Sequence, residues 1–245
     1  MPDLYTLEAR VAPFVVAFLP LVIGIGVLAG EPVLPSGLVG TIGLAMLYSV
    51  FGDLGRERGK RLEPGLYRSW GGGRSTAALR CRAGENPDVA TLRARRLRAE
   101  ALLRAEPLPS EADELGDPQA ADAVYDRAVK AMFQKTRGNP TVENANRRYG
   151  FARNSLGLKP IALVVGLLGL ALCLLKLDWL RSGIGEDAYA AGGLALVLFL
   201  LYWQLFGVTS QFARRQNERL AEALYDAVLS LELDIKPRHR LVRGP

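Results

Sequence analysis

Four long apolar stretches constrain the fold of this chain more than any other feature. They cover residues 11–30, 33–51, 160–176 and 189–207 and carry almost no charge. A helix that crosses the hydrocarbon core of a bilayer needs about 20 apolar residues, and about 17–25 are tolerated. The third stretch reaches that length only by continuing to Leu180. The sequence therefore predicts an integral membrane protein with four transmembrane helices.

The four stretches form two hairpins, because only short turns rich in Pro, Gly or Ser separate the first from the second and the third from the fourth. Each pair then returns to the side that it left. The predicted fold is an all-α integral membrane protein. Its predicted parts are a first transmembrane hairpin (1–51), a cytoplasmic helical domain (52–159), a second hairpin (160–207) and a cytoplasmic amphipathic helix with a basic tail (208–245).

The distribution of positive charge predicts the orientation. Of the 31 Lys and Arg residues, 29 lie on the side shared by the N-terminus, residues 52–159 and the tail, and only Lys176 and Arg181 lie near the other side. Because Lys and Arg near span ends favour the cytoplasmic side, both termini are expected to be cytoplasmic, in a bacterial inner membrane. The first stretch lacks the basic segment that opens a signal peptide, so we interpret it as a retained span.

Few residues suit catalysis or metal binding. Cys81 and Cys173 lie on opposite sides of the predicted membrane boundary, and the single histidine, His239, has no Cys or His near it. No nucleophile and base have the spacing of a catalytic pair. We therefore expect no enzyme activity, no cofactor and no metal. The basic composition is attributed mainly to the positive-inside bias and to contact with anionic membrane lipid.

The soluble segments are predicted to be helical. Apolar residues recur on one face over 119–137 and again over 220–231, and residues 89–105 are rich in Ala, Leu, Arg and Glu. Residues 141–156 could form a further helix before the third span, with Gly150 as a weak point. The three glycines that follow Trp70 predict a loop, because glycine is costly inside a helix.

That glycine loop is the first candidate ligand site. Glycines let backbone N–H groups turn toward an anion, while an arginine adds charge and hydroxyls add donors. The predicted phosphate-binding residues are Gly72, Gly73, Arg74, Ser75 and Thr76. The pattern is not a Walker A loop, and the alternative interpretation is a flexible connector near the membrane surface.

The second candidate site precedes the third span. Arginine grips phosphate, aromatic rings stack on bases, and asparagine amides read donors and acceptors, which suits a nucleotide or nucleic acid. The alternative is a basic and aromatic collar at the lipid interface. The candidate residues are Asn144, Asn146, Arg147, Arg148, Tyr149, Arg153 and Asn154.

Three sequence patterns together resemble a family of uncharacterised bacterial four-span membrane proteins. They are the Trp-Gly-Gly loop at residues 70–72, an Asp-Pro-x-Ala-Ala-Asp helix start at 117–122, and a Glu-Asn-x-Asn-x-x-Tyr-Gly-Phe-x-Arg-Asn run at 143–154. The architecture is also similar to that of four-helix membrane effectors of bacterial anti-phage systems. That resemblance implies a membrane effector that a nucleotide or nucleic-acid signal switches on to permeabilise the inner membrane.

The uncharged interiors of the four stretches leave little to line an aqueous pore within one subunit. Conduction would then require a homo-oligomer, and Gly24, Gly40, Gly43, Gly166 and Gly169 could let helices approach closely, within or between subunits. The leading hypothesis is an oligomeric, channel-like effector gated by an anionic signal or a partner. The alternative is a non-conducting scaffold or regulatory subunit that docks a soluble cytoplasmic partner through the apolar faces at 121–132 and 220–231.

Overall fold

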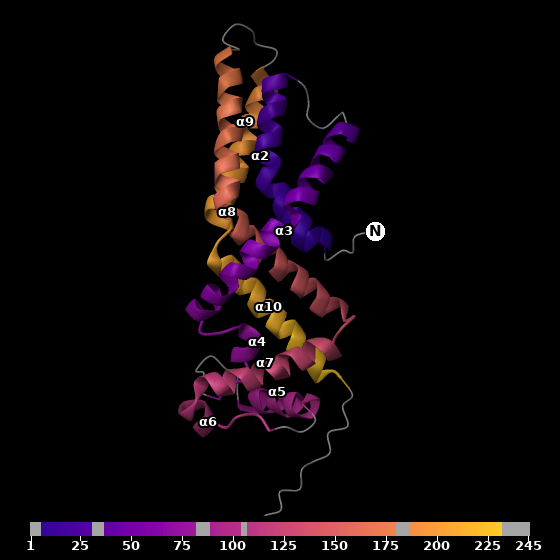
Figure 1. The fold of residues 1–245 in the computed structure, drawn as a ribbon, viewed down its shortest axis with the longest axis vertical. Helices are drawn as coiled ribbons and strands as arrows, with labels where there is room; N and C mark the ends of the chain where they lie inside the picture. Colours follow the sequence, from indigo (N-terminus) through magenta and orange to yellow (C-terminus); the bar gives the residue numbers. More distant parts are fainter. Residues whose placement is uncertain (1–5, 31–36, 82–88, 104–106, 180–186, 232–245) are drawn as a thin grey trace, which may run out of the picture. The chain divides into compact units, whose positions relative to one another are not determined.

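The computed structural model describes residues 6–30, 37–81, 89–103, 107–179 and 187–231, with the side chains of 37–52, 177–179 and 187–189 outside the description. Every element in this part of the chain is helical. The described chain forms two compact units, one of residues 1–70 with 144–217 and one of residues 71–143 with 218–245. Figure 1 traces the helices along the chain. The prediction of an all-helical protein is confirmed for the described residues.

Three helical segments are long and apolar enough to cross a membrane: Leu7–Ala29, Pro140–Lys176 and Ala190–Gly207. They correspond to the first, third and fourth predicted spans. The predicted second span, 33–51, begins outside the described residues and continues as the first part of α3 (Gly37–Ser69), where the side chains are not described. The structure thus supports three membrane-spanning candidates, and a fourth span with its two-hairpin arrangement stays a prediction.

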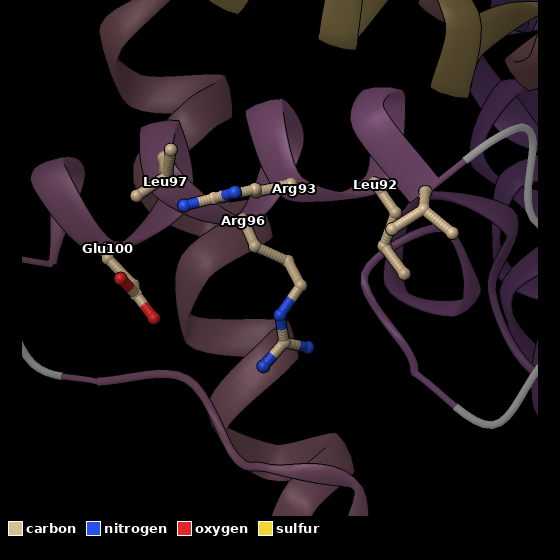
Figure 2. Close-up of a pocket in the computed structure, with 6 residues that line it drawn as sticks. Leu92, Arg93, Arg96, Leu97 and Glu100 are labelled. Atoms are coloured by element: carbon tan, nitrogen blue, oxygen red, sulfur yellow. The ribbon is translucent and has the colours of Figure 1, made fainter.

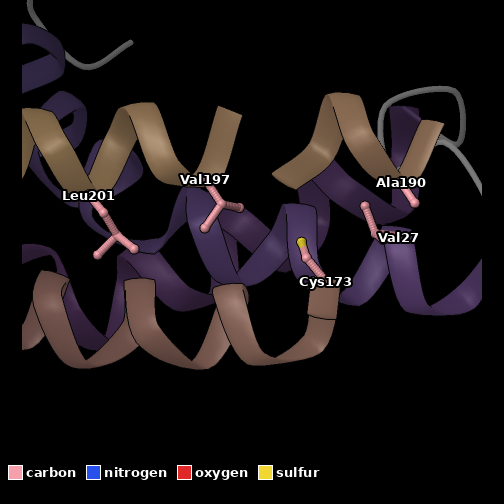
Figure 3. Packing of buried hydrophobic residues seen from close by; sticks show 5 residues of the cluster. All are labelled: Val27, Cys173, Ala190, Val197 and Leu201. Atoms are coloured by element: carbon pink, nitrogen blue, oxygen red, sulfur yellow. The ribbon is translucent and has the colours of Figure 1, made fainter. Parts of the chain in front are cut away.

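The first unit packs its apolar helices around two clusters. α2 (Ala12–Ala29), α8 (Pro140–Trp179) and α9 (Asp187–Tyr202) lie side by side in Figure 1 and share buried side chains. Figure 3 shows one of the clusters, which consists of Val27, Cys173, Ala190, Val197 and Leu201. The other cluster is built on Phe14, Ala17, Leu158 and Ala162.

Glycines let these helices meet backbone to backbone. A Cβ placed on Gly24 of α2 would lie 2.6 Å from the carbonyl oxygen of Gly169 in α8, and one on Gly157 would lie 2.5 Å from the backbone nitrogen of Gly59 in α3. At such contacts only glycine fits without a shift of a backbone. The close approach of Gly24 and Gly169 therefore occurs within one chain. This agrees with the interpretation that these glycines let helices pack within a subunit.

Two of the helices extend far beyond their apolar parts. α3 runs to Ser69, and α8 is a single helix of 40 residues that passes through Gly150 without interruption. At a rise of 1.5 Å per residue, α8 is about 60 Å long, about twice the thickness of a hydrocarbon core. The predicted helix at 141–156 and the third span are thus one element, and Gly150 is not a break.

A turn of π-helix lies at the start of the first span and at the end of the last span. η1 (Leu7–Val11) leads into α2, and η2 (Trp203–Gly207) ends the helix that α9 begins. The first has a reason in the sequence, because Pro13 has no N–H to donate to the carbonyl of Ala9. After η2, Val208 leaves the helical conformation, and α10 (Ser210–Leu229) begins with the hydroxyl of Thr209 accepting from the N–H of Phe212.

The second unit contains α4 (Arg74–Ala77), α5 (Val89–Leu102), α6 (Glu111–Gly116), α7 (Pro118–Lys135) and the end of α10. The Asp117 side chain caps α7 by accepting from the N–H groups of Gln119 and Ala120, and Pro118 occupies the first turn as predicted. The short helix α6 lies between the predicted helices at 89–105 and 119–137, where no helix was predicted from the sequence. Its capping box pairs Ser110 with Asp113.

The structure confirms that α7 and α10 each carry an apolar face, and other parts of the same chain cover both faces. Ala121, Tyr125, Ala128 and Met132 of α7 are at most 3% exposed. Leu220, Leu224 and Val228 of α10 are also buried. These faces belong to the hydrophobic core, so neither is available as the docking surface that the scaffold hypothesis assigned to it.

Candidate functional site

The first candidate segment adopts a conformation that only glycine favours. Gly71 and Gly72 have φ angles of 78° and 122°, in the region that side chains with a Cβ rarely adopt. Gly73 is extended and precedes the four-residue helix α4. A Cβ on Gly72 would lie 2.6 Å from a nitrogen of the Arg80 guanidinium, so the loop is folded closely around this side chain.

The polar groups of this segment bind partners within their own unit. Arg74 forms an ion pair of 3.1 Å with Glu218, and its side chain is only 15% exposed. Thr76 donates to a carboxylate oxygen of Asp126 at 2.7 Å, and the carbonyl of Ser75 accepts from the hydroxyl of Tyr225. Arg74 and Thr76 thus bind carboxylates of the same chain, and a phosphate site at this loop stays a prediction.

Arg80 extends this pattern to α7. Its guanidinium donates two hydrogen bonds, of 2.9 and 2.7 Å, to the two carboxylate oxygens of Asp122, and it also donates to the carbonyl of Gly71. A bidentate arginine–carboxylate pair fixes orientation as well as charge. The glycine loop is therefore anchored to α7 at Asp122 and Asp126.

A buried carboxylate organises the neighbouring part of the second unit. Glu114 is fully buried and accepts from the backbone N–H of Cys81 and from the hydroxyl of Tyr125. Burial, and then the hydrogen bond to Glu114, raises the pKa of Tyr125 well above its ordinary value. Arg96 donates to this same hydroxyl and to the carbonyls of Leu79 and Pro109. The segments before α5 and before α6 thus meet the helices α5, α6 and α7 at these groups.

The second candidate segment lies on α8, and its first residues differ in their surroundings. Arg147 forms an ion pair of 2.9 Å with Glu8 of η1, whereas Arg148 is exposed. Asn144 and Asn146 are half-buried. Within the described part of the chain, Arg148 and the two asparagines have no hydrogen-bonding partner among other side chains or the backbone.

The rest of this segment forms a polar junction between α3 and α8. The carboxylate of Glu63 accepts from the hydroxyl of Tyr149 at 2.7 Å, from the hydroxyl of Tyr67 at 2.9 Å, and from the Arg153 guanidinium at 3.1 and 3.2 Å. Arg153 is 10% exposed and also lies over the Tyr149 ring. These groups bind one another, so Tyr149 and Arg153 act as structural residues in this state. We call Glu63, Tyr67, Tyr149 and Arg153 the polar junction.

Burial, followed by the negative charge of Glu63, raises the pKa of Tyr67 to about 12. The ordinary value of a tyrosine is 10.0. The phenol is thus held in its neutral, hydrogen-bond-donating form at physiological pH. A protonated Tyr67 and an ionised Glu63 suit each other, because the carboxylate needs donors when it is withdrawn from water.

Asn154, the last residue of the segment, binds the start of the first span. Its amide nitrogen donates to the carbonyl of Ala9 in η1 at 2.6 Å, and the residue is 2% exposed. In a regular α-helix this carbonyl would accept from the N–H of residue 13, which is absent in Pro13. The Asn154 side chain therefore binds the backbone of its own chain.

The structure places the two candidate segments in different compact units and gives each its own partners. Sequence reasoning identified Arg74, Thr76, Tyr149 and Arg153 but missed Glu218, Asp126 and Glu63, the carboxylates that bind them, and it missed the pair of Arg80 with Asp122. These carboxylates lie on three helices, α3, α7 and α10, and no spacing in the sequence links them to their partners. A group of three Cys, His, Asp or Glu side chains able to hold a metal ion is absent from the described residues.

No protein-family model, curated protein or solved structure matches the chain. The described residues define the class by their fold, which is all-helical and includes three helices long and apolar enough to span a membrane. Any inference about its function therefore depends on the chain's own residues.

Proposed function

We propose that the chain is an oligomeric, channel-like effector of a bacterial inner membrane, switched on by an anionic signal or a partner at its cytoplasmic part. The observation that supports this most is the polar junction, which lies where α3 and α8 continue beyond their apolar parts. A buried ion pair stabilises a fold less than apolar packing would, and its best-documented use is to select one arrangement. A switch between arrangements of α3 and α8 would use such a junction.

Assembly is part of the proposal because the apolar parts of the three described spans offer no charged path within one chain. No charged residue occurs in 12–29, 160–175 or 190–207, and the exposed side chains there include Leu168, Leu175 and Phe199. Exposed apolar side chains on these helices suit contact with lipid tails or with other membrane helices. A conducting path would have to form between copies of the chain.

The signal in this proposal is a nucleotide or nucleic acid, and Arg148 with Asn144 and Asn146 is the part of the candidate set best placed to bind it. Arg148 is exposed, and a guanidinium binds phosphate through two parallel hydrogen bonds. The remaining candidates bind other parts of the chain in the described state. A role in anti-phage defence rests on the architectural resemblance alone.

The proposal is tested with full-length protein in liposomes that contain a self-quenched dye. We expect dye release when a cyclic oligonucleotide, a nucleoside triphosphate or a short RNA is added from the side that carries Arg148. Arg148→Ala should abolish the response, whereas the matched control Lys130→Ala, an exposed cation on α7, should keep it. The proposal would be overturned if the reconstituted protein were monomeric and released no dye with any of these probes.

The second candidate function, a non-conducting scaffold or regulatory subunit for a soluble partner, is favoured by an open pocket on α5. The pocket has a volume of about 330 Å³, and Figure 2 shows Leu92, Arg93, Arg96, Leu97 and Glu100 along it. Leu97 is 45% exposed, and Val89, which also lines the pocket, is 82% exposed. Exposed apolar groups with charged neighbours are typical of protein-binding surfaces.

This candidate predicts a soluble protein that co-purifies with the chain in fixed stoichiometry. Leu97→Glu should remove the partner, while Leu115→Glu, an equally drastic change at an exposed leucine of α6, should not. A partner that survives Leu97→Glu would exclude the α5 pocket as its binding surface.

A further inference from the structure

Lys159 of α8 binds the backbone at the point where the last span ends. Its ammonium group donates to the carbonyl of Leu205 at 3.0 Å and to the carbonyl of Val208 at 2.9 Å. The last carbonyls of a helix have no partner within the helix, and a cation is favoured beside them. Among the described residues, no carboxylate lies within ion-pair distance of Lys159. Its charge is therefore directed at this helix end.

The carbonyls that Lys159 binds belong to an irregular part of the backbone. Leu205 lies in η2, where the N–H of Val208 donates to the carbonyl of Trp203 at 3.0 Å in place of the usual α-helical bond. Val208, which is 1% exposed, has ψ of 90° and separates the span from α10. π-helical turns are rare and occur often at functional sites.

Asn154 makes the equivalent contact at the first span. It donates to the carbonyl of Ala9 within η1, for which Pro13 can provide no N–H. Asn154 and Lys159 are five residues apart, which corresponds to about 140° around α8 and about 7.5 Å along it. α8 thus binds both η1 and η2, at positions that lie about one and a half turns apart along its axis.

We propose that α8 is a clasp that holds both π-helical turns, through Asn154 on one side and Lys159 on the other, and that rotation of α8 about its axis releases the two turns together. The clasp fixes the direction in which α10 leaves the last span, because Lys159 binds the residues just before α10 begins. Movement of α8 would in this way change the first span, the last span and α10 at once. The clasp operates in the same way in a channel, a transducer or a scaffold.

The test is hydrogen exchange of the full-length protein in lipid nanodiscs, followed in peptides that cover 7–18 and 203–214. Lys159→Met keeps the length of the side chain and removes the charge. It should speed exchange in 203–214 by on the order of tenfold, because local opening sets the exchange rate. Lys159→Arg should retain most of the protection, and the control Lys135→Met on α7 should leave both peptides unchanged.

The coupling of the two turns is tested with Asn154→Leu. It should speed exchange in 7–18 and, to a smaller extent, in 203–214, with Asn144→Leu as the matched control. Unchanged exchange in 203–214 in either variant would overturn the clasp. A uniform increase that also includes α5 would overturn it as well, because it would show a loss of global stability in place of a local release.

Discussion

Glu63 is the residue on which the polar junction depends, because it accepts four hydrogen bonds from the other three side chains of the junction. Arg153→Met removes the charge partner and leaves a carboxylate that is 22% exposed. Breaking a buried pair in this way costs about 3–5 kcal/mol, and the remaining exposure of Glu63 favours the lower end of that range. We expect a loss of about 3 kcal/mol in the free energy of unfolding.

A double-mutant cycle with Glu63→Gln checks this prediction. The double variant removes both charges, so it should be more stable than Arg153→Met alone, with a coupling on the order of 1–3 kcal/mol. Unfolding is measured in detergent micelles by circular dichroism. Additive effects of the two substitutions would contradict the hydrogen-bonded pair as the source of the loss.

Tyr67 makes the stability of the junction sensitive to alkaline pH. Its folded-state pKa of about 12 lies above the ordinary value of 10.0, so the folded state favours the protonated phenol. The contribution is fully present below pH 10 and is lost as the pH rises toward 12, by at most about 2–3 kcal/mol. We expect the Tm to fall over this interval.

Tyr67→Phe provides the comparison, because it removes the ionisable group and keeps the ring. The variant should be less stable than the wild type at pH 8 and should lose less stability between pH 10 and pH 12. Burial also raises the pKa of Tyr225, so part of the alkaline loss remains in the variant. Equal losses in the two proteins would show that Tyr67 does not contribute.

At the scale of single residues, the sequence indicated which polar side chains matter but did not indicate which residues they bind. Tyr149 and Arg153 were identified by residue type, yet their acceptor lies 86 and 90 positions away on another helix. Which carboxylate meets which guanidinium depends on helix packing, and single-sequence patterns do not encode it. Pro13 is the exception, because a missing N–H at that position already implies a carbonyl in need of a donor.

Among the elements, the contact between α2 and α8 tolerates no side chain at Gly24. Gly24→Ala would place a Cβ 2.6 Å from a backbone oxygen of Gly169, so the helices would have to separate. Overpacking of this kind costs about 1–3 kcal/mol. Gly192 of α9 has no atom within 4 Å of its Cβ position, so Gly192→Ala should be neutral or slightly stabilising.

Thermal unfolding of the two variants in the same lipid nanodiscs compares them directly. The Tm of Gly24→Ala should fall, and that of Gly192→Ala should not. A fall in both would mean that glycine is required in these helices for a reason other than the contact with Gly169.

The long helices were largely predictable from the sequence, whereas the short helix α6 and the two π-helical turns were not. Apolar periodicity placed α7, which ends at Lys135, and Gly138 follows it with φ of 85°. α6 was missed although the Ser110-x-x-Asp113 capping box marks its start. η1 and η2 had no predicted counterpart, because a π-helical turn depends on which neighbour supplies hydrogen bonds to the displaced carbonyls.

For the whole molecule, the number of spans decides where each soluble segment lies. The described residues support three spans, and the sequence predicts a fourth at 33–51. With four spans the two termini lie on the same side, and with three they lie on opposite sides. The distribution of Lys and Arg favours four, with residues 52–159 in the cytoplasm.

Reporter fusions in a bacterial host distinguish these topologies. Alkaline phosphatase is active only outside the cytoplasm, and green fluorescent protein exported in an unfolded form stays dark. With four spans, phosphatase fused after Gly30 should be active, whereas fluorescent protein fused after Ser69 or after Pro245 should fluoresce. If residues 33–51 do not cross and the N-terminus is cytoplasmic, all three fusions will report the outside, because the two spans between Ser69 and Pro245 return the chain to the side that carries Ser69. That result would place α3 and the start of α8 outside the cytoplasm, and a cytoplasmic signal could then reach neither Arg148 nor the polar junction.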